Sequence, residues 1–226
     1  MSSSSISRQP ARRGIVIAVD GPAASGKGTI ARALAAHYGL PHLDTGSLYR
    51  AVALNLWRWG GDPASEFEAV RACEEIGSNL DDPEIRSETV SKIASKISAY
   101  PAVREALLER QRAFAAQDGG AVLDGRDIGT VIAPNADSKL FVTASAEARA
   151  QRRVRELLER GTPAGFEDVL VDLRARDARD SSREAAPLEH ADDADLLDTS
   201  ELSVEQAIAE AIRLVDARLQ AAPRKR

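Results

Sequence analysis

Residues 15–29, IVIAVDGPAASGKGT, decide the fold of this chain, because a short apolar run breaks there into a glycine-rich turn that carries one lysine. Gly21, Gly26 and Lys27 have the G-x-x-x-x-G-K spacing of a loop that surrounds phosphate groups. Glycines let backbone N–H groups point inward around an anion, while the lysine and the N-terminus of the next helix supply positive charge. We therefore expect phosphate groups to be bound by the following residues: Gly21, Pro22, Ala23, Ala24, Ser25, Gly26, Lys27, Gly28 and Thr29.

The alternative interpretation of this segment is an ordinary glycine-rich turn between a strand and a helix. The apolar run before it, and the helical spacing of Ile30 and Leu34 after it, favour phosphate binding. One position departs from the common pattern, because Gly28 stands where many such loops carry Ser or Thr, and a hydroxyl follows only at Thr29. This departure puts a direct bond from the loop to Mg²⁺ in question.

The composition of the chain narrows its class. A length of 226 residues suits one α/β domain with a sizeable core and a small insertion. The net charge of -5 and an aromatic content of 4% argue against nucleic-acid binding, which needs positive charge and stacking surfaces. Local arginine clusters remain compatible with a small polyanionic ligand.

Cysteine usage and the absence of targeting signals point to the cytoplasm. The single cysteine, Cys73, excludes an internal disulfide framework and suits a reducing compartment. No apolar run reaches the length of a membrane span, and residues 1–13 lack the apolar core of a secretory signal. We expect flexible tails at residues 1–13 and 219–226, with an organellar address as the alternative for the first. No exposed apolar seam is evident, so we expect a monomer with no membrane or nucleic-acid partner.

Strand-like apolar runs alternate with segments of helical periodicity along the chain. We expect strands at residues 15–20, 41–44, 121–124, 139–143 and 195–199. Helices are expected at residues 26–39, 47–59, 146–160 and 167–180, with others beginning near Asp82-Pro83, at Pro101 and after Ser203. This alternation predicts an α/β fold whose mostly parallel sheet is covered by helices on both faces.

Polar residues follow two of the expected strands, at the edge where parallel sheets bind ligands. Asp44, Thr45, Tyr49 and Arg50 follow the second strand, and residues 124–127, DGRD, follow the third. A carboxylate there can hold Mg²⁺ or its waters opposite the phosphate loop. Taken singly, Asp44 is better explained as a helix cap and Arg126 as a surface charge. A phosphate loop in the same sheet reverses that balance and favours a shared site.

Two arginine-rich segments are expected to form a lid. If residues 174–183, RARDARDSSR, are helical, then Arg176, Asp180 and Arg183 lie on one face, and arginine suits phosphate recognition. The segments bracket a turn at residues 161–165, which suggests a lid that closes over bound phosphates and excludes water. The helix at residues 146–160 carries four arginines for which a solvated surface is as good an explanation as a catalytic role: Arg149, Arg152, Arg153 and Arg155.

Five stretches together resemble the bacterial cytidylate kinases: GPAASGKGT, LDTGSLYRAVAL, SAYPAVREALLERQRAF, LDGRDIGTV and RDARDSSREAAPL. They cover most of the chain, from Ile15 to about Val215, and the DTGSLYR, YPAVRE and DGRDIGT motifs are far more specific than the loop. The resemblance implies a P-loop nucleoside monophosphate kinase, a three-layer α/β sandwich around a five-stranded parallel sheet. The kinase domain is expected at about residues 14–218, with a monophosphate-binding region at about 45–118 and a helical lid at about 145–183.

The resemblance also implies an activity and roles for individual residues. The activity is transfer of the γ-phosphoryl group of ATP to CMP or dCMP, with Mg²⁺ as cofactor. The residues implied to act on the transferred phosphoryl group are Lys27, Arg126 and Arg183. Those implied to bind the acceptor are Thr45, Tyr49, Arg50, Ser95, Arg104, Asp127, Arg176, Asp180 and Arg183, of which Ser95, Arg104 and Asp127 recognise cytosine. No residue is assigned as a metal ligand, and assistance of Mg²⁺ by Asp124 stays open.

Residues 60–85 depart from the family pattern, in which a small three-stranded sheet usually stands at this place. The segment is short, is rich in Asp, Pro and Glu, and lacks alternating hydrophobic residues, so we expect a shortened insertion. Ser95 and Arg104 are retained, so base recognition is expected to persist.

Two other functions remain open from the sequence. A kinase for a different small acceptor would share the loop but would not need Ser95, Arg104 and Asp127 together. A non-catalytic nucleotide switch would carry an Asn-Lys-x-Asp motif for guanine, which the sequence lacks, and would not need two arginine-rich segments.

Overall fold

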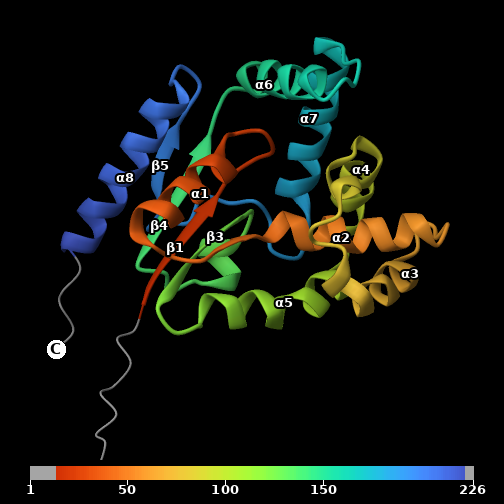
Figure 1. Cartoon of the computed structure of the whole chain (residues 1–226), viewed down its shortest axis with the longest axis horizontal. Coiled ribbons are helices and arrows are strands. Elements are labelled where there is room, and N and C mark those ends of the chain that lie inside the picture. The colour runs from red at the N-terminus through yellow and green to blue at the C-terminus, as the bar shows by residue number, and fades with distance from the viewer. Residues whose placement is uncertain (1–13, 222–226) are drawn as a thin grey trace, which may run out of the picture.

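A five-stranded sheet lies at the centre of the protein in a computed structural model that describes residues 14–221 (Figure 1). The strands are β1 (Ile15–Asp20), β2 (His42–Asp44), β3 (Gly120–Gly125), β4 (Ser138–Thr143) and β5 (Asp195–Asp198). Their order is β2-β3-β1-β4-β5, and each neighbouring pair is parallel. The expected α/β fold with a five-stranded parallel sheet is confirmed.

Helices surround the sheet and extend beyond it. They are α1 (Lys27–Tyr38), α2 (Thr45–Arg58), α3 (Glu66–Arg71), α4 (Glu88–Ile97), α5 (Pro101–Ala115), α6 (Ala146–Glu159), α7 (Phe166–Ser182) and α8 (Val204–Ala221), with the short helices η1 (Ala72–Ser78), η2 (Pro83–Arg86) and η3 (Ile128–Ile132). Gly39 ends α1 in the left-handed conformation, and Ser203 and Gln206 form the expected capping box before α8. Because α8 continues to Ala221, residues 219–221 of the expected tail are helical. The other tail residues, 1–13 and 222–226, lie outside the described part of the chain.

The central strand β1 shows why both faces of the sheet are covered. Alternate side chains of a strand point to opposite faces. Ile17 and Val19 pack with residues of α1 and α8 on one face, whereas Ala18 packs with Ala115 of α5 and with Ile128 on the other. A strand buried on both faces needs a continuous apolar run, and the sequence of β1 supplies one.

Residues 45–115 form a helical unit beside the sheet, with an apolar core of its own (Figure 1). Leu48, Val52 and Leu54 of α2 are fully buried there, together with Val90 of α4. Residues 60–85 fold as α3, η1 and η2 and contain no strand, as the sequence indicated.

Helices α6 and α7 lie above the end of the sheet toward which β1 runs (Figure 1). Ala150 of α6 and Leu170 and Leu173 of α7 pack against Ala23 in the phosphate loop. This small apolar cluster ties the helix pair to the loop. No helix among residues 14–221 is long and apolar enough to cross a membrane.

Candidate active site

The phosphate loop joins β1 to α1 through backbone conformations that suit small residues. Gly21 has φ 151°, and a Cβ atom on it would lie 2.0 Å from the carbonyl oxygen of Val142. Ala24 and Gly26 are also at positive φ, 59° and 89°. Helix α1 begins at Lys27 with no side-chain cap, so its first N–H groups are available to an anion.

Lys27 is the cation of this loop. Its Nζ donates a hydrogen bond to the carbonyl oxygen of Pro22 at 3.2 Å. Burial, followed by the positive charge of Arg126, lowers the pKa of Lys27 to about 7, although Asp124 and Asp44 act in the opposite direction. A bound polyanion would therefore stabilise the charged form of Lys27.

A cavity of about 920 Å³ opens at the carboxyl ends of the strands. Residues 23–29 of the loop line it, whereas Gly21 and Pro22 do not. The structure also brings every residue expected to bind the acceptor to this cavity: Thr45, Tyr49, Arg50, Ser95, Arg104, Asp127, Arg176, Asp180 and Arg183. Side chains from α2, α4, α5, α7 and the end of β3 thus meet the loop in one place.

The start of α2 positions Thr45 and Arg50. Asp44 caps the helix by accepting a hydrogen bond from the Ser47 N–H at 3.2 Å, and it also pairs with Arg50 at 2.6 Å. Burial disfavours the Asp44 carboxylate, but Arg50 and the Ser47 hydroxyl outweigh burial and lower its pKa. Thr45 Oγ1 donates to the carbonyl oxygen of Asp124 at 2.8 Å, which ties α2 to β3. Asp44 is therefore both a helix cap and the partner of a cavity arginine.

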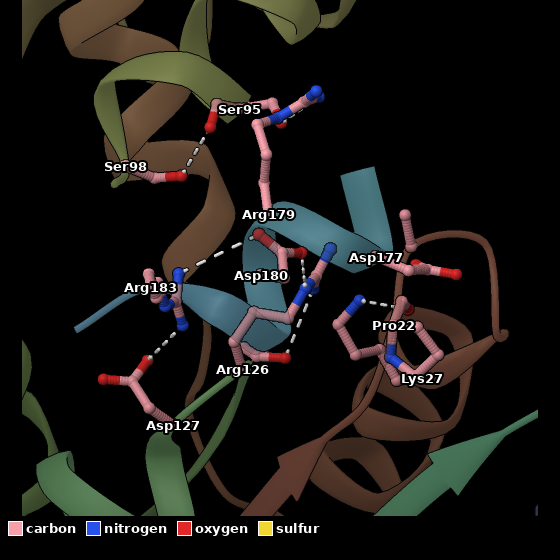
Figure 2. A network of polar contacts seen from close by, with 12 residues as sticks. Pro22, Lys27, Ser95, Ser98, Arg126, Asp127, Asp177, Arg179, Asp180 and Arg183 are labelled. Atoms are coloured by element: carbon pink, nitrogen blue, oxygen red, sulfur yellow. Dashed lines mark hydrogen bonds and ion pairs between the residues drawn. The ribbon is translucent and has the colours of Figure 1, made fainter. Parts of the chain in front are cut away.

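Charged side chains at the ends of β3 and α7 form a network at the cavity wall (Figure 2). Arg104 of α5 joins this network through Asp127. Arg126 Nε donates to Asp180 Oδ2 at 2.8 Å, and Arg183 lies 3.9 Å from Asp180. Arg183 also lies 3.9 Å from Asp127, which pairs with Arg104. Three guanidinium groups and two carboxylates are thus held together beside the phosphate loop.

Arg183 corrects one expectation about α7. The helix ends at Ser182, and Arg183 follows it with extended backbone at φ -67° and ψ 141°, so only Arg176 and Asp180 belong to the helical face. Burial, followed by Arg126, lowers the pKa of Arg176 to about 10. Burial opposes the charge of Asp180, but Arg126 and Arg176 outweigh it and hold the pKa of Asp180 below its usual value.

The three residues expected to recognise cytosine come from three elements, and two of them are in contact. Arg104 pairs with Asp127, and its guanidinium carbon lies 5.8 Å from the ring centre of Tyr49. Ser95 is buried in α4, and its hydroxyl accepts a hydrogen bond from Arg179 of α7 at 3.2 Å. Ser95 is therefore joined to α7 in this structure, and not to the Arg104–Asp127 pair.

The arginines of α6 do not form a uniformly solvated surface. Arg149 is buried, forms two hydrogen bonds with the Asp177 carboxylate at 3.1 and 2.7 Å, and donates to the carbonyl oxygen of Ala23 at 3.3 Å. It therefore joins α6 and α7 to the phosphate loop. Arg152 hydrogen-bonds to Thr199 and Arg153 to Glu88, whereas Arg155 is exposed.

Comparison with known proteins identifies the family. The family model described as cytidylate kinase matches residues 17–217. The chain belongs to the cytidylate kinase family. A curated cytidylate kinase of Xanthobacter autotrophicus is 58% identical over 206 residues, covering 90% of this chain and 98% of that one. One of Methylocella silvestris is 55% identical over 203 residues, covering 89% and 94%.

A solved structure supports the fold independently of these sequences. The crystal structure of an uncharacterized protein from Eubacterium ventriosum matches with a TM-score of 0.54 at 14% identity, covering 90% of this chain and 98% of that one. Members of the cytidylate kinase family are kinases with ATP as phosphoryl donor. The cavity described above is therefore the candidate active site of a nucleotide kinase.

Two residues that support the candidate active site from outside the cavity lining were missed from the sequence. Asp20 is buried at the end of β1 and accepts hydrogen bonds from the N–H groups of Ile128 and Gly129. It gave no local signal, because it ends an apolar strand and its partners are more than 100 positions away. His42 of β2 has its Nε2 atom 2.7 Å from Asp124 Oδ1. Its only signal was a polar side chain in a short strand.

Proposed function

We propose that this chain transfers the γ-phosphoryl group of ATP to CMP or dCMP in the described cavity, giving ADP and CDP or dCDP. One observation carries the proposal: the phosphate loop and arginines of α2, β3 and α7 line one cavity with the Arg104–Asp127 pair. A donor phosphate site, an acceptor phosphate site and a base site then fall within one cavity.

The donor half of the site is assigned to residues 21–29. The uncapped start of α1 and the positive φ angles of the loop fit a chain that wraps a phosphate group with N–H donors. Arg149 supports the loop through the carbonyl oxygen of Ala23. Lys27 then places a full positive charge between donor and acceptor phosphates.

The acceptor half is assigned to the remaining cavity residues. Arginine suits the acceptor phosphate, because its planar group binds phosphate oxygens with two hydrogen bonds. Thr45 and Asp180 are placed near the sugar. Cytosine has an amino donor and two acceptor atoms, which suit Asp127 and Ser95 on one side and Arg104 on the other. The phosphate-binding residues in this assignment are Arg50, Arg126, Arg176 and Arg183.

Mg²⁺ fits the donor atoms of this cavity as an ion held mainly by ATP. Among the described residues, no group of three or more His, Cys, Asp or Glu side chains is arranged to hold a metal. Mg²⁺ usually keeps several waters and binds phosphates with one or two carboxylates. Asp124 suits that role, since His42 orients it and its Oδ2 lies 3.6 Å from where a Cβ would stand on Gly28. The bound ion would neutralise charge that develops on the phosphates.

The mechanism follows from the charge of the acceptor. A monophosphate with a second pKa of about 6 is already largely a dianion at neutral pH, so no general base is needed. The protein contributes in-line positioning and stabilisation of negative charge, which we assign to Lys27, Arg126 and Arg183. Closure of a lid at about residues 145–183 over a binding region at about 45–118 would exclude water from the transfer.

We place this activity in cytoplasmic pyrimidine nucleotide metabolism, carried out by a monomer whose kinase domain spans about residues 14–218. One chain supplies every residue of the proposed site, so the proposed transfer needs no residue from a second subunit.

Substitution of the loop lysine tests the catalytic assignment. Lys27→Ala is expected to lower Mg²⁺-dependent ADP formation from ATP and CMP by more than about 100-fold, because it removes a charge that acts on the transferred group. Arg213→Ala, which removes an exposed pair with Glu210 on α8, serves as the control and should keep full activity. A folded Lys27→Ala protein with full turnover would contradict the assignment.

A further inference from the structure

Asp20 stands between two parts of the active site. It is the last residue of β1, directly before Gly21 of the phosphate loop, and only 6% of it is exposed. Its Oδ1 accepts a hydrogen bond from the Ile128 N–H at 2.8 Å, and its Oδ2 accepts one from the Gly129 N–H at 2.7 Å. A buried carboxylate with both oxygens bonded to backbone donors is a strong, directional contact.

These two donors are the first N–H groups of η3, the short helix that follows the DGRD segment. The first N–H groups of a helix have no partner within it and need one from outside. The residue in the capping position of η3 is Asp127, a residue type that usually accepts a hydrogen bond from the second or third helical N–H. Here the Asp127 side chain makes no cap. It pairs with Arg104 and lies 3.9 Å from Arg183.

Gly129 shows that the close approach of Asp20 is built into the chain. A Cβ atom at position 129 would lie 3.3 Å from Asp20 Oδ2 and 3.1 Å from Cδ of Lys139, which is tighter than most such contacts. The absence of a side chain at this position lets the carboxylate reach the backbone from the neighbouring strand.

We propose that Asp20 is a positioning residue: by capping η3 from β1, it releases the Asp127 side chain to pair with Arg104 and face the nucleotide base. The inference rests on the proposed function, in which Asp127 and Arg104 recognise cytosine. Without the Asp20 carboxylate, the unpartnered Gly129 N–H would attract Asp127 as a local cap and draw it away from Arg104. Base discrimination would then weaken, although Asp20 itself does not line the cavity.

The test compares Asp20→Asn with Asp137→Asn. An amide at position 20 has one acceptor oxygen and turns its NH₂ group toward the other N–H. Asp137 is the matched control, because its Oδ2 accepts the Val16 N–H at 2.9 Å at the other end of the same strand. For each protein, kcat and KM are measured with CMP and with UMP, and KM is measured for ATP, at pH 8, where Asp20 with its pKa of about 7 is mostly ionised.

Asp20→Asn is expected to lower the preference for CMP over UMP in kcat/KM by about tenfold or more, with KM for ATP changed by less than about threefold. Asp137→Asn should keep the preference of the wild type. In an Asp127→Asn background, Asp20→Asn should lower the preference no further, because the residue through which it acts is already altered.

Other outcomes overturn the inference. One is an unchanged preference for CMP over UMP in Asp20→Asn. Another is an equal loss of kcat/KM toward ATP, CMP and UMP. The third is a loss of preference in the Asp127→Asn background as large as the loss that Asp20→Asn causes alone. If Asp20→Asn does not fold, Asp20→Ser is measured in the same way, and failure of both to fold shows a core role instead. If the wild type prefers CMP and Asp20→Asn keeps that preference, the positioning role of Asp20 is refuted and the proposed function stands. A wild type that does not distinguish CMP from UMP refutes the proposed base recognition as well.

Discussion

Positive charges at the centre of the site are held close together against their mutual repulsion. Burial is the main cause of the lowered pKa values of Lys27 and Arg176, and Arg126 is the next cause in both cases. A bound polyanion relieves that repulsion and favours the charged form of each group. The residues therefore suit a ligand with several phosphate charges and disfavour a neutral one.

Nucleotide binding is expected to take up protons near pH 8. With a pKa of about 7, Lys27 is mostly neutral at pH 8 in the free protein, whereas triphosphate binding stabilises its cation. Uptake of about 0.9 proton per molecule of a non-hydrolysable ATP analogue is expected at pH 8, and it should shrink below pH 7, where Lys27 is already charged. Calorimetry in two buffers of different ionisation enthalpy measures this number. Binding at pH 8 without proton uptake would show that Lys27 is already protonated.

At the scale of single residues, the sequence predicts those residues whose role depends on their neighbours in the chain. The phosphate loop is contiguous, so its spacing alone places Lys27. The cap of η3 by Asp20 has no such signal, because β1 and η3 become neighbours only through the sheet. Arg149 was equally ambiguous, since its burial depends on Asp177 in another helix.

At the scale of the elements, α4 contacts both α6 and α7, the helices of the proposed lid. Glu88 pairs with Arg153 of α6, and Lys92 pairs with Asp172 of α7 at 2.9 Å. The first pair is partly exposed and the second is exposed, so each is expected to contribute modestly. Together they join the insertion to the lid across the cavity and favour its closed arrangement.

Loss of one such contact should weaken substrate retention more than chemistry. Glu88→Gln is expected to raise KM for ATP and CMP by roughly two- to fivefold and to leave kcat within about twofold, because one weak link of the closed arrangement is lost. Glu210→Gln, which removes a partner of Arg213 on α8, is the matched control. A large fall in kcat with unchanged KM would instead place Glu88 in the chemistry.

Elements with local boundary signals were predictable, and those that depend on packing were not. The capping box at Ser203 and the proline at position 101 gave helix starts that the structure confirms. The Asp82-Pro83 signal starts only the short helix η2, and α4 begins separately after a new cap at Ser87. Residues 60–81 gave no helical pattern, because α3 and η1 are too short to be stable alone. They form against α2, with Ala69 and Ile76 buried in the same core.

At the scale of the whole molecule, the sheet and the insertion have separate apolar cores. The phosphate loop belongs to the sheet, and the helix carrying Ser95 belongs to the insertion, so the cavity lies where two bodies meet. Polar contacts join them across this boundary. A site of this kind permits the closing motion that the proposed transfer needs.

The stability of the molecule is expected to depend on the ionisation of Asp20. Burial raises the pKa of Asp20 to about 7 from 3.8, against the effect of its two backbone hydrogen bonds. The native state therefore binds this proton more tightly than the unfolded state, and its stability falls as pH rises between about 4 and 7. In denaturant titrations, the free energy of unfolding of the wild type should fall by about 2 kcal/mol relative to that of Asp20→Asn from pH 5 to pH 7. The Asp137→Asn protein should follow wild type, and parallel curves for wild type and Asp20→Asn would contradict the raised pKa.

The measurement that tests the central claim most directly is Mg²⁺-dependent ADP formation from ATP with CMP, dCMP, UMP, AMP and GMP offered singly. Turnover with CMP and dCMP that exceeds turnover with each other acceptor by tenfold or more is the result expected of a site in which Ser95, Arg104 and Asp127 recognise cytosine. Equal turnover with UMP, or no turnover with CMP, would contradict it.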